Sequence, residues 1–344
     1  VMDHFYNGNE FDMSIVHKAI EDVPDRTRIV IRSTVGPDNL EDNWIHWPEF
    51  LRENNLEEDS DDKSIPFIIG ADGATQSEME SWFTNRKTIF VSPKTAAVYK
   101  LSRNAMLAAK VTMANYIHKV CVEQNIEYNN VSSLLKEHAN LGTSHWDVPG
   151  PDGQYGFGGS CFRKDILHLS YLCEYYGLPE VADYWASVVR INDFQTDRFF
   201  QNILKQQFNT LAGKKITLFG FAFKPDTGDT RDSPAIPLCR KLLSEHAQVR
   251  VHDPRAREET EHDLASMEGD IAFVEDPYEA AYGAHAVALV TQWQQYRDLD
   301  YGRILENMMR PAYLFDGRNH LDHQYLFNLG YNVFPLGSAP LTHL

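Results

Sequence analysis

The sequence has little cysteine, no long apolar segment and a shortage of basic residues. Its cysteines form no closely spaced pair and are too few for a disulfide framework in 344 residues, which indicates a reducing, cytoplasmic setting. They are Cys121, Cys161, Cys173 and Cys239. No apolar stretch approaches the roughly 20 residues that a membrane span requires, and the start VMDHFYNGNEFD has neither the basic nor the apolar region of a signal peptide. We therefore expect neither a membrane span nor an export signal.

The shortage of basic residues restricts the partners. The chain has 32 Lys and Arg against 49 Asp and Glu, a formal net charge of -17. Such a surface repels nucleic acid and anionic lipid, so we predict no nucleic-acid partner and no membrane partner. A phosphate-bearing ligand would need a few local basic groups. We also predict no metal cofactor.

The composition that is present, 43% hydrophobic and 12% aromatic, is typical of a folded globular protein. Because single cores stop growing near roughly 250 residues, the length predicts more than one domain. Helix-like runs alternate with strand-like runs in the first part of the chain, which indicates an α/β unit. The strand-like runs are RIVIRS, PFIIG and TIFVS, and helices are expected from Ser14 and over Ser77 to Phe83.

A second kind of pattern begins near residue 94. From Ala96 to Glu123 there are 28 residues without Gly or Pro, which predicts one long helix. Further helical segments run to about Phe208, interrupted by a glycine-rich stretch. After Gly213, strand-like runs such as KITLFG and HAVALVT again alternate with helical runs. The predicted fold is α/β, with two doubly wound Rossmann-like domains joined by a long central helix and a helical middle domain; the boundaries are 1–93, 94–208 and 209–344.

The segment GFGGSCFRKD, ending at Asp165, is the most informative one. If a helix starts near Cys161, the positive end of its dipole and nearby Lys164 would favour a thiolate, and hence a nucleophile. Asp165 lies four residues on, where it could move a proton or orient water. Spacing alone also allows a buried structural cysteine. The other three cysteines lie in helical patterns with apolar neighbours, so we expect structural roles for them.

Two other groups of polar residues are candidates. Lys100 and Asn104 are spaced i, i+4 on the long helix, so they share a face and could together stabilise an oxyanion; a solvated helix face is the alternative. In the last third, Lys224 and Arg231 lie between a strand and a helix that Pro234 opens, where doubly wound sheets bind ligands. Arg318 follows a later strand at the same carboxyl edge. Composition alone leaves phosphate binding and a structural role equally open.

These segments resemble the UDP-glucose/GDP-mannose dehydrogenase family, which carries GFGGxCxxKD, GxAFKxxTxDxRxSP and a late DGR in that order. All three stand in this sequence, around Cys161, Lys224 and Arg318. Three further motifs match: STV at residues 33–35, PEFLRE at 48–53 and KLxxN at 100–104. The resemblance thus covers nearly the whole chain. It implies that residues 1–93 are the remaining part of an NAD-binding domain, 94–208 a dimerising domain with the catalytic cysteine, and 209–344 a UDP-sugar-binding domain.

The resemblance also implies a reaction and a set of roles. The family oxidises a nucleotide sugar twice at carbon 6, with two NAD molecules and no released aldehyde. Cys161 would form a thiohemiacetal and then a thioester, Lys100 and Asn104 would hold the oxyanions, Asp165 and Thr34 would position water, and Glu49 would serve in acid-base steps. The implied substrate-binding residues are Phe50, Leu51, Glu53, His145, Phe157, Gly158, Phe223, Lys224 and Arg318. The implied cofactor-binding residues are Ser33, Thr34, Lys164 and Arg231, with Arg231 reaching the cofactor diphosphate.

The sequence departs from the family pattern at several points. It contains no G-x-G-x-x-G dinucleotide fingerprint, and it begins at a point matching the later half of the first domain. Gly36 stands where the family usually has proline, and Trp47 where it commonly has Asn; both changes bear on water positioning. His145 stands near the place of an Arg-Ile-Gly segment that many members use to reach a neighbouring subunit.

The sequence therefore predicts an NAD-dependent nucleotide-sugar 6-dehydrogenase that converts UDP-glucose to UDP-glucuronate. Another UDP-sugar or GDP-mannose is the alternative substrate. A catalytically silent nucleotide-sugar-binding homologue is the alternative of a different class, favoured by the missing fingerprint and disfavoured by the intact catalytic set. The resemblance places the long helix at the core of a two-fold interface and so implies a homodimer or a higher homo-oligomer; the apolar and small residues nearly all round the helix suit burial on more than one face.

Overall fold

The computed structural model of the chain describes residues 13–24, 27–41, 43–50, 62–83, 86–150, 153, 155–158 and 160–343. The chain divides into two compact units. The first unit combines residues 1–107 with 161–189, and the second combines 108–160 with 190–344. Two of the three boundaries fall inside long helices, α4 (Pro93–Glu123) and α7 (Pro179–Gln206), and the third falls at the start of α6.

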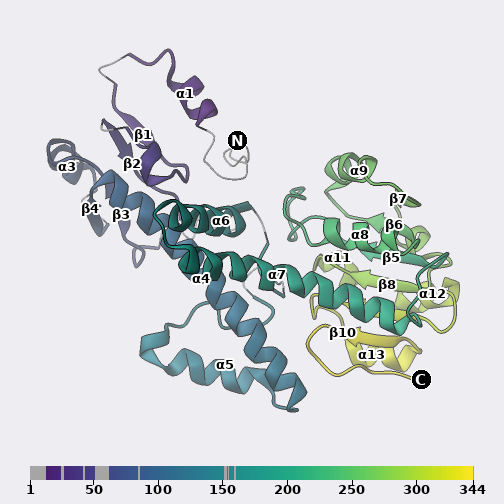
Figure 1. The fold of residues 1–344 in the computed structure, drawn as a ribbon. Coiled ribbons are helices and arrows are strands. Elements are labelled where there is room, and N and C mark those ends of the chain that lie inside the picture. Colours follow the sequence, from purple (N-terminus) through teal and green to yellow (C-terminus); the bar gives the residue numbers. More distant parts are fainter. Residues whose placement is uncertain are drawn as a thin grey trace. The chain divides into compact units, whose positions relative to one another are not determined.

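The first unit contains a four-stranded sheet in the order β1-β2-β3-β4 (Figure 1). Its strands are β1 (Ile29–Ile31), β2 (Trp44–His46), β3 (Phe67–Gly70) and β4 (Thr88–Val91). β1 pairs with β2 and β3 with β4 in parallel, whereas β2 and β3 meet antiparallel through the single pair His46 and Gly70. Three of these strands were predicted from the sequence, and β2 was not.

Short helices complete this unit: α1 (Ser14–Ile20), the 3-10 turn η1 (Pro37–Asn39), α3 (Gly73–Met79), the 3-10 turn η3 (Glu80–Trp82) and α6 (Ser160–Tyr175). The helix predicted from Ser77 begins four residues earlier, at Gly73. The reason is a side-chain cap, because the Asp72 carboxylate accepts a hydrogen bond from the Thr75 amide at 2.7 Å. Such a cap satisfies a backbone donor that the first helical turn leaves without a partner.

The predicted long helix is present as α4, which begins at Pro93 instead of Ala96. Proline suits the first helical turn because its missing N–H group has no helical partner there, and the Ser92 hydroxyl accepts from the Thr95 amide at 3.1 Å. One face of α4 is buried, including Leu101, Ala105 and Ala108 at 0% exposure. Apolar side chains on other faces stay exposed, namely Val98, Tyr99, Met106, Met113, Tyr116 and Val120.

The second unit contains a six-stranded parallel sheet in the order β10-β9-β8-β5-β6-β7 (Figure 1). The strands are β5 (Lys215–Phe219), β6 (Gln248–His252), β7 (Ile271–Phe273), β8 (Ala286–Leu289), β9 (Tyr313–Asp316) and β10 (Asn332–Pro335). The chain leaves β5 toward β6 and then returns to β5's other side with β8, so the strand order reverses between β5 and β8. Doubly wound sheets bind ligands at the carboxyl ends of their strands beside such a reversal.

Helices cover both faces of this sheet, as the doubly wound prediction requires (Figure 1). Alternate residues of β8 show the two layers: Ala286 and Ala288 belong to one buried cluster with α7, whereas Val287 and Leu289 belong to the other. The helices of the first layer are α7, α8 (Ala235–Ser244) and α9 (Arg257–Ala265). Those of the second are α10 (Pro277–Ala281), α11 (Gln294–Arg297), α12 (Tyr301–Asn307) and α13 (His323–Leu329).

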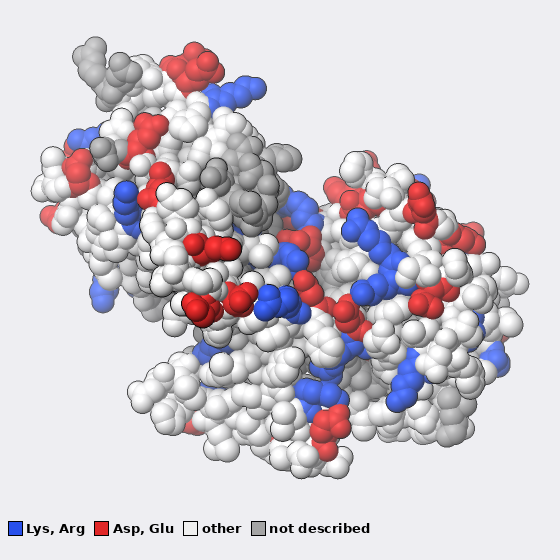
Figure 2. Space-filling model, viewed as in Figure 1, with Lys and Arg blue, Asp and Glu red and all other residues white. Residues whose placement is uncertain are grey.

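Outside the sheet, the second unit also holds the distal part of α4, α5 (Tyr128–Glu137) and the 3-10 turn η4 (Ala139–Leu141). On the face shown in Figure 2, Lys and Arg side chains are interspersed with Asp and Glu side chains and do not gather in one patch. No helix among the described residues is both long and apolar enough to cross a bilayer.

Candidate active site

Cys161 lies in the first turn of α6, as predicted, and its side chain is exposed. The other cysteines are buried or partly buried, and burial raises the pKa values of Cys173 and Cys239. A thiol that is reluctant to ionise is a poor nucleophile, because the thiolate is the reactive form. Cys161 is therefore the cysteine that combines access with the positive end of a helix.

Asn104 of α4 and Asp165 of α6 meet in the interior beside this turn. The Asn104 amide nitrogen donates to Asp165 Oδ2 at 2.7 Å, and the two residues are 2% and 0% exposed. Lys164 forms an ion pair with the other oxygen of Asp165, with 3.0 Å between Nζ and Oδ1. A buried carboxylate is tolerated when such partners offset its loss of hydration. Among the described residues, this bond uses one of the two N–H groups of the Asn104 amide.

Lys100 is 8% exposed, so the solvated helix face considered as an alternative does not apply to it. Its ammonium donates to the backbone carbonyl of Glu49. Burial lowers the pKa of Lys100, while the nearby negative groups of Asp165 and Cys161 oppose that shift. Lys100 precedes Asn104 by one turn of α4 and Cys161 precedes Asp165 by one turn of α6, so the hydrogen bond between Asn104 and Asp165 brings these two helix faces together. Lys100, Asn104, Cys161 and Asp165 thus form one cluster within the first unit.

The loop after β2 contacts this cluster through Glu49 and Phe50, which both lie against Lys100. The Glu49 carboxylate forms an ion pair with Arg32 and accepts the Phe50 amide at 2.8 Å. The Phe50 ring lies beneath two cations, with its centroid 4.9 Å from Lys100 Nζ and 5.0 Å from Arg103 Cζ. Of the remaining residues predicted in this loop, Leu51 and Glu53 lie outside the described residues.

Ser33 and Thr34 follow the carboxyl end of β1, where ligands bind in open α/β sheets. The Ser33 carbonyl accepts a hydrogen bond from His46 Nε2 at 3.2 Å. Burial, with a smaller contribution from the charge of Lys100, lowers the pKa of His46 to about 4. His46 is therefore neutral near pH 7 and fixes the loop without adding positive charge.

Gly36, in the same loop, lies close to α6. A Cβ atom added at Gly36 would stand 2.5 Å from Asn39 Oδ1 and 2.9 Å from His168 Nε2. The absence of a side chain at position 36 thus permits a close approach between this loop and the α6 helix that carries Cys161.

In the second unit, the glycine-rich segment before Cys161 is anchored by α7. The Asn192 side chain binds both backbone groups of Phe157, accepting from its N–H at 2.7 Å and donating to its carbonyl at 2.8 Å. Gly156 adopts φ +100°, and a Cβ atom there would lie 2.4 Å from Asn192 Oδ1. Glycine is therefore required at position 156. Gly158 is partly buried in the same segment, and His145 lies in an upstream loop with φ 66°.

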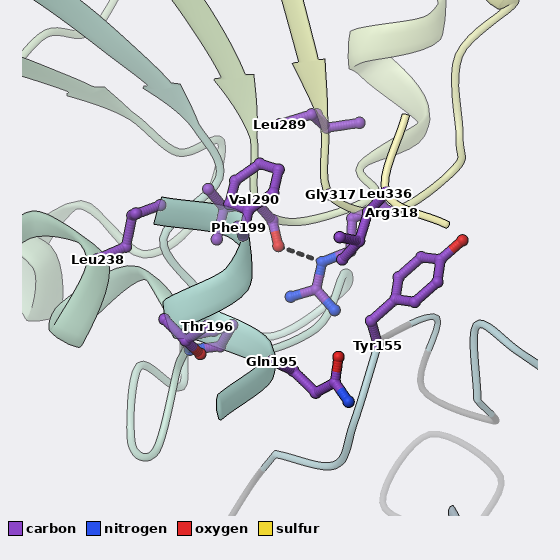
Figure 3. A pocket seen from close by; sticks show the side chains of 11 residues that line it. Tyr155, Gln195, Thr196, Phe199, Leu238, Leu289, Val290, Gly317, Arg318 and Leu336 are labelled. Carbon is purple, nitrogen blue, oxygen red and sulfur yellow. Dashed lines mark hydrogen bonds between the residues drawn. The ribbon is translucent and has the colours of Figure 1, made fainter. Parts of the chain in front are cut away.

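Arg318 follows β9 and is 4% exposed. It donates through Nε to the Val290 carbonyl and through a terminal nitrogen to the Gly153 carbonyl at 3.4 Å. Figure 3 shows its guanidinium between Gln195 and Tyr155 in a pocket of about 370 Å³, which includes the open mouth. The pocket is lined by residues that follow β8, β9 and β10 and by α7 and α8, including Phe199, Leu238, Val290, Gly317 and Leu336.

A buried carboxylate organises the turn that carries Arg318. Asp316 accepts hydrogen bonds from the amides of Arg318, His320 and Leu321 at 2.8 to 2.9 Å and from His323 Nε2 at 2.9 Å. Burial alone would raise the pKa of Asp316, but the hydrogen bonds from His323 and the amides outweigh it, and the pKa is lowered. The charged carboxylate therefore fixes the position of Arg318.

Lys224 follows β5 at the same edge of the sheet and is 7% exposed. Its Nζ lies 4.9 Å from the ring centroid of Phe223, whose amide donates to the Asp229 carbonyl at 3.0 Å. Arg231 is half exposed and forms a bidentate pair with the Asp229 carboxylate at 2.7 and 2.8 Å. Lys224 and Arg318 thus lie at one edge as predicted, while Arg231 is engaged by an acidic neighbour.

The sequence did not single out Arg32, His46, Gln195 or Tyr155, which the structure places beside the predicted residues. Arg32 and Tyr155 had a sequence signal, since Arg32 immediately precedes the STV motif and Tyr155 immediately precedes the GFGG segment. Among the described residues, no group of three or more His, Cys, Asp or Glu side chains could hold a metal ion.

Two family models match the chain. The central domain of the UDP-glucose/GDP-mannose dehydrogenase family matches residues 94–194, and the UDP binding domain of the same family matches residues 217–323. Among curated proteins, UDP-glucose 6-dehydrogenase 2 of Oryza sativa is 39% identical over 322 residues, covering 86% of this chain and 66% of the relative. UDP-glucose 6-dehydrogenase of Caenorhabditis elegans is 37% identical over 319 residues, covering 88% and 65%. The chain thus spans about two thirds of the length of these relatives.

Solved structures show the same similarity. A UDP-glucose dehydrogenase from Pyrobaculum islandicum superposes with a TM-score of 0.79 at 25% identity, covering 98% of this chain and 79% of that one. An NDP-N-acetyl-D-galactosaminuronic acid dehydrogenase from Methanosarcina mazei gives 0.78 at 19% identity, covering 98% and 76%. The second match supports the fold alone.

Proposed function

Because the chain belongs to the UDP-glucose/GDP-mannose dehydrogenase family, we propose that it acts as an NAD-dependent nucleotide-sugar 6-dehydrogenase converting UDP-glucose to UDP-glucuronate. The two family models match 101 and 107 residues, together 208 of 344. The observation that carries the proposal is the cluster in which exposed Cys161 adjoins buried Lys100, Asn104 and Asp165. UDP-glucose is the proposed substrate because the similar rice and nematode proteins are named for it.

The proposed reaction needs a nucleophile that can form and release an acyl group. Cys161 adds through Sγ to carbon 6 of the aldehyde produced by the first oxidation, giving a thiohemiacetal whose oxidation leaves a thioester. NAD supplies the acceptor for the hydride that carbon 6 loses in each oxidation. Water then cleaves the thioester, so that the carboxylate is released and the thiol is restored. No aldehyde leaves the site, because carbon 6 is bound to sulfur between the two oxidations.

Lys100 and Asn104 are proposed to stabilise the negative charge that develops on the carbon 6 oxygen. Both are preorganised by contacts outside the substrate: Lys100 by the Glu49 carbonyl and Asn104 by the Asp165 carboxylate. Preorganised donors in a buried site stabilise a transition state because they need little rearrangement when the charge forms. Asp165 and Thr34 are proposed to position the hydrolytic water, and Glu49 to assist the acid-base steps.

Lys224 and Arg318 of the second unit are proposed to bind the nucleotide sugar. Lys224 and Arg318 lie at the carboxyl edge of the second sheet and suit a ligand bearing negative phosphates, which the acidic chain otherwise repels. The further proposed contacts are Phe50, Leu51, Glu53, His145, Phe157, Gly158 and Phe223.

The residues that fit the cofactor form part of a site. The Ser33 and Thr34 backbone and hydroxyls at the end of β1 suit a dinucleotide at the carboxyl edge of the sheet. Lys164, 16% exposed and paired with Asp165, would add local positive charge. Arg231 belongs to the second unit, and to bind a cofactor phosphate it would have to exchange its Asp229 partner. The sequence has no G-x-G-x-x-G turn, so these residues alone would hold the cofactor weakly.

We propose that residues 1–93, 94–208 and 209–344 are cofactor, central and nucleotide-sugar domains, and that the chain forms at least a homodimer. The exposed apolar side chains of α4, including Met106, Met113 and Val120, support the second statement, since such a stripe is normally covered by a partner. Four unpaired cysteines are consistent with a reducing, cytoplasmic location.

A substrate panel tests the function. The natural full-length protein should reduce NAD with UDP-glucose and form UDP-glucuronate, whereas other UDP-sugars and GDP-mannose should react more slowly. Faster reaction with another nucleotide sugar would retain the reaction class and change the substrate. Binding of UDP-glucose without reduction of NAD would replace the proposal with a catalytically silent binding protein.

A further inference from the structure

Arg32 lies at the centre of a set of contacts that reaches Lys100. Its guanidinium pairs with the Glu49 carboxylate, and its backbone carbonyl accepts the Glu49 amide at 3.2 Å. Arg32 therefore binds both the side chain and the backbone of Glu49. An arginine with a fixed guanidinium plane orients a carboxylate more strictly than a flexible ammonium does.

Trp47 fixes Arg32 from the other side. The guanidinium carbon lies 4.2 Å from the centroid of the Trp47 ring, a cation-π contact. Trp47 is itself set in an aromatic cluster, with centroids 5.0 Å from both Phe67 and Phe83. Its amide also donates to the Ile31 carbonyl at 2.9 Å, at the end of β1. The Arg32 side chain, 39% exposed, is thus held on its inner side by the Trp47 ring.

The other end of this arrangement is the Lys100 ammonium. It donates to the Glu49 carbonyl and lies 4.9 Å from the ring centroid of Phe50, the residue whose amide binds the Glu49 carboxylate. Every contact that orients Glu49 therefore also determines where an acceptor for Lys100 stands. Lys100 has four rotatable bonds, and a buried ammonium without a fixed acceptor would change position.

We propose that Arg32, stacked on Trp47, is a positioning residue that holds Lys100 in place through the Glu49 backbone. The proposal rests on the dehydrogenase function proposed above for the consequence in catalysis. It assigns Trp47, which stands where the family commonly has Asn, to the support of Arg32. Glu49 then helps to position Lys100, in addition to the acid-base role proposed for its carboxylate.

Chemical modification of Lys100 tests whether Arg32 holds it in place, and this test does not require enzyme activity. Acetylation of Lys100 by acetic anhydride can be followed by peptide mass spectrometry. It should be several-fold faster in Arg32→Met than in the chain without a substitution, because the ammonium loses its fixed acceptor. Arg28→Met is the matched control, since Arg28 directly precedes β1 as Arg32 directly follows it, and it forms a surface ion pair with Glu78 at 2.6 Å. An unchanged rate in Arg32→Met, or an equal increase in Arg28→Met, overturns the proposal.

Kinetics of the natural full-length protein tests the consequence. Arg32→Met should lower kcat about 10-fold to 100-fold while changing the KM for UDP-glucose less than about 3-fold, because misplacement of a catalytic group by about 1 Å has such an effect. Arg32→Lys should recover part of the loss. The double variant Arg32→Met/Glu49→Gln should be no slower than the slower single variant, since both act on one contact.

Independent, multiplicative effects in the double variant would overturn the coupling between Arg32 and Glu49. If Arg32→Met fails to fold, as judged by thermal melting, Trp47→Leu keeps the ion pair while removing the stack, and it should show the same faster acetylation and the same loss of kcat. Lack of both effects in Trp47→Leu overturns the proposal. If the protein without substitutions protects Lys100 from acetylation but does not oxidise UDP-glucose, the proposed function is refuted, whereas the positioning of Lys100 by Arg32 is still supported.

Discussion

Replacement of Lys100 separates transition-state stabilisation from substrate binding. Lys100→Met keeps most of the buried stem volume and removes the ammonium, which matters because the side chain is only 8% exposed. A donor directed at charge that develops only in the transition state lowers the barrier without much changing ground-state affinity. Loss of one such donor costs on the order of 100-fold to 1,000-fold in rate, roughly 3 to 4 kcal/mol. We expect that loss in turnover at saturation, with UDP-glucose affinity nearly unchanged.

Lys224→Met is the matched control for this experiment. Lys224 is buried to the same degree, at 7% exposure, but its proposed partner is the nucleotide-sugar phosphate, which is present throughout the reaction. This variant should weaken binding more than it lowers saturated turnover. Calorimetry should measure affinity and steady-state kinetics should measure turnover, because KM need not equal Kd. Preserved turnover with weakened binding in Lys100→Met would refute the oxyanion role.

The remaining predictions concern the nucleophile, the cofactor, the assembly and the pH dependence. Cys161→Ser should lose steady turnover, with an adduct trapped for mass spectrometry, because an ester hydrolyses more slowly than a thioester; unchanged turnover removes Cys161 from the mechanism. In calorimetry the 344-residue chain should bind UDP-glucose more tightly than NAD, since its sequence has no G-x-G-x-x-G turn, and the reverse order would contradict this. Light scattering should give at least twice 39.4 kDa at micromolar concentration, and a monomer would contradict the role of α4. Burial lowers the pKa of His46, His118 and His168 to about 4, so the unfolded chain binds more protons between pH 6.5 and 4. The stability contributed by these three neutral histidines should be lost as pH falls through that window, on the order of 3 kcal/mol each at most, and a urea midpoint that stays constant from pH 7 to 4.5 would oppose this.

Local patterns in the sequence predicted much of the fold. The strand-like runs KITLFG and HAVALVT became β5 and β8, and the stretch without Gly or Pro became α4. The strands that were missed are β2, β7 and β10. They are no shorter than the predicted strand β1, so length does not explain the misses; what the local sequence could not show is their pairing, which depends on neighbours that are distant along the chain.

The sequence predicted those parts of the candidate site that depend on local spacing, and it missed those that depend on contacts between distant residues. Lys100 and Asn104 share a helix face, so their spacing indicated that they act together, and the start of α6 beside Cys161 followed from the glycine-rich segment. The pairing of Asn104 with Asp165, 61 residues away, left no trace in the spacing. The contact of Lys100 with the Glu49 backbone was also invisible, because a carbonyl acceptor carries no side-chain signature.

The proposed reaction is a two-step oxidation at carbon 6 through one covalent intermediate on Cys161. Its most direct test is the stoichiometry of a complete turnover of the natural full-length protein, measured as NADH formed against UDP-glucose consumed and UDP-glucuronate produced. We predict two NADH for each UDP-glucuronate, with no free aldehyde captured by a carbonyl reagent during the reaction. One NADH per UDP-glucose with release of the aldehyde would contradict it.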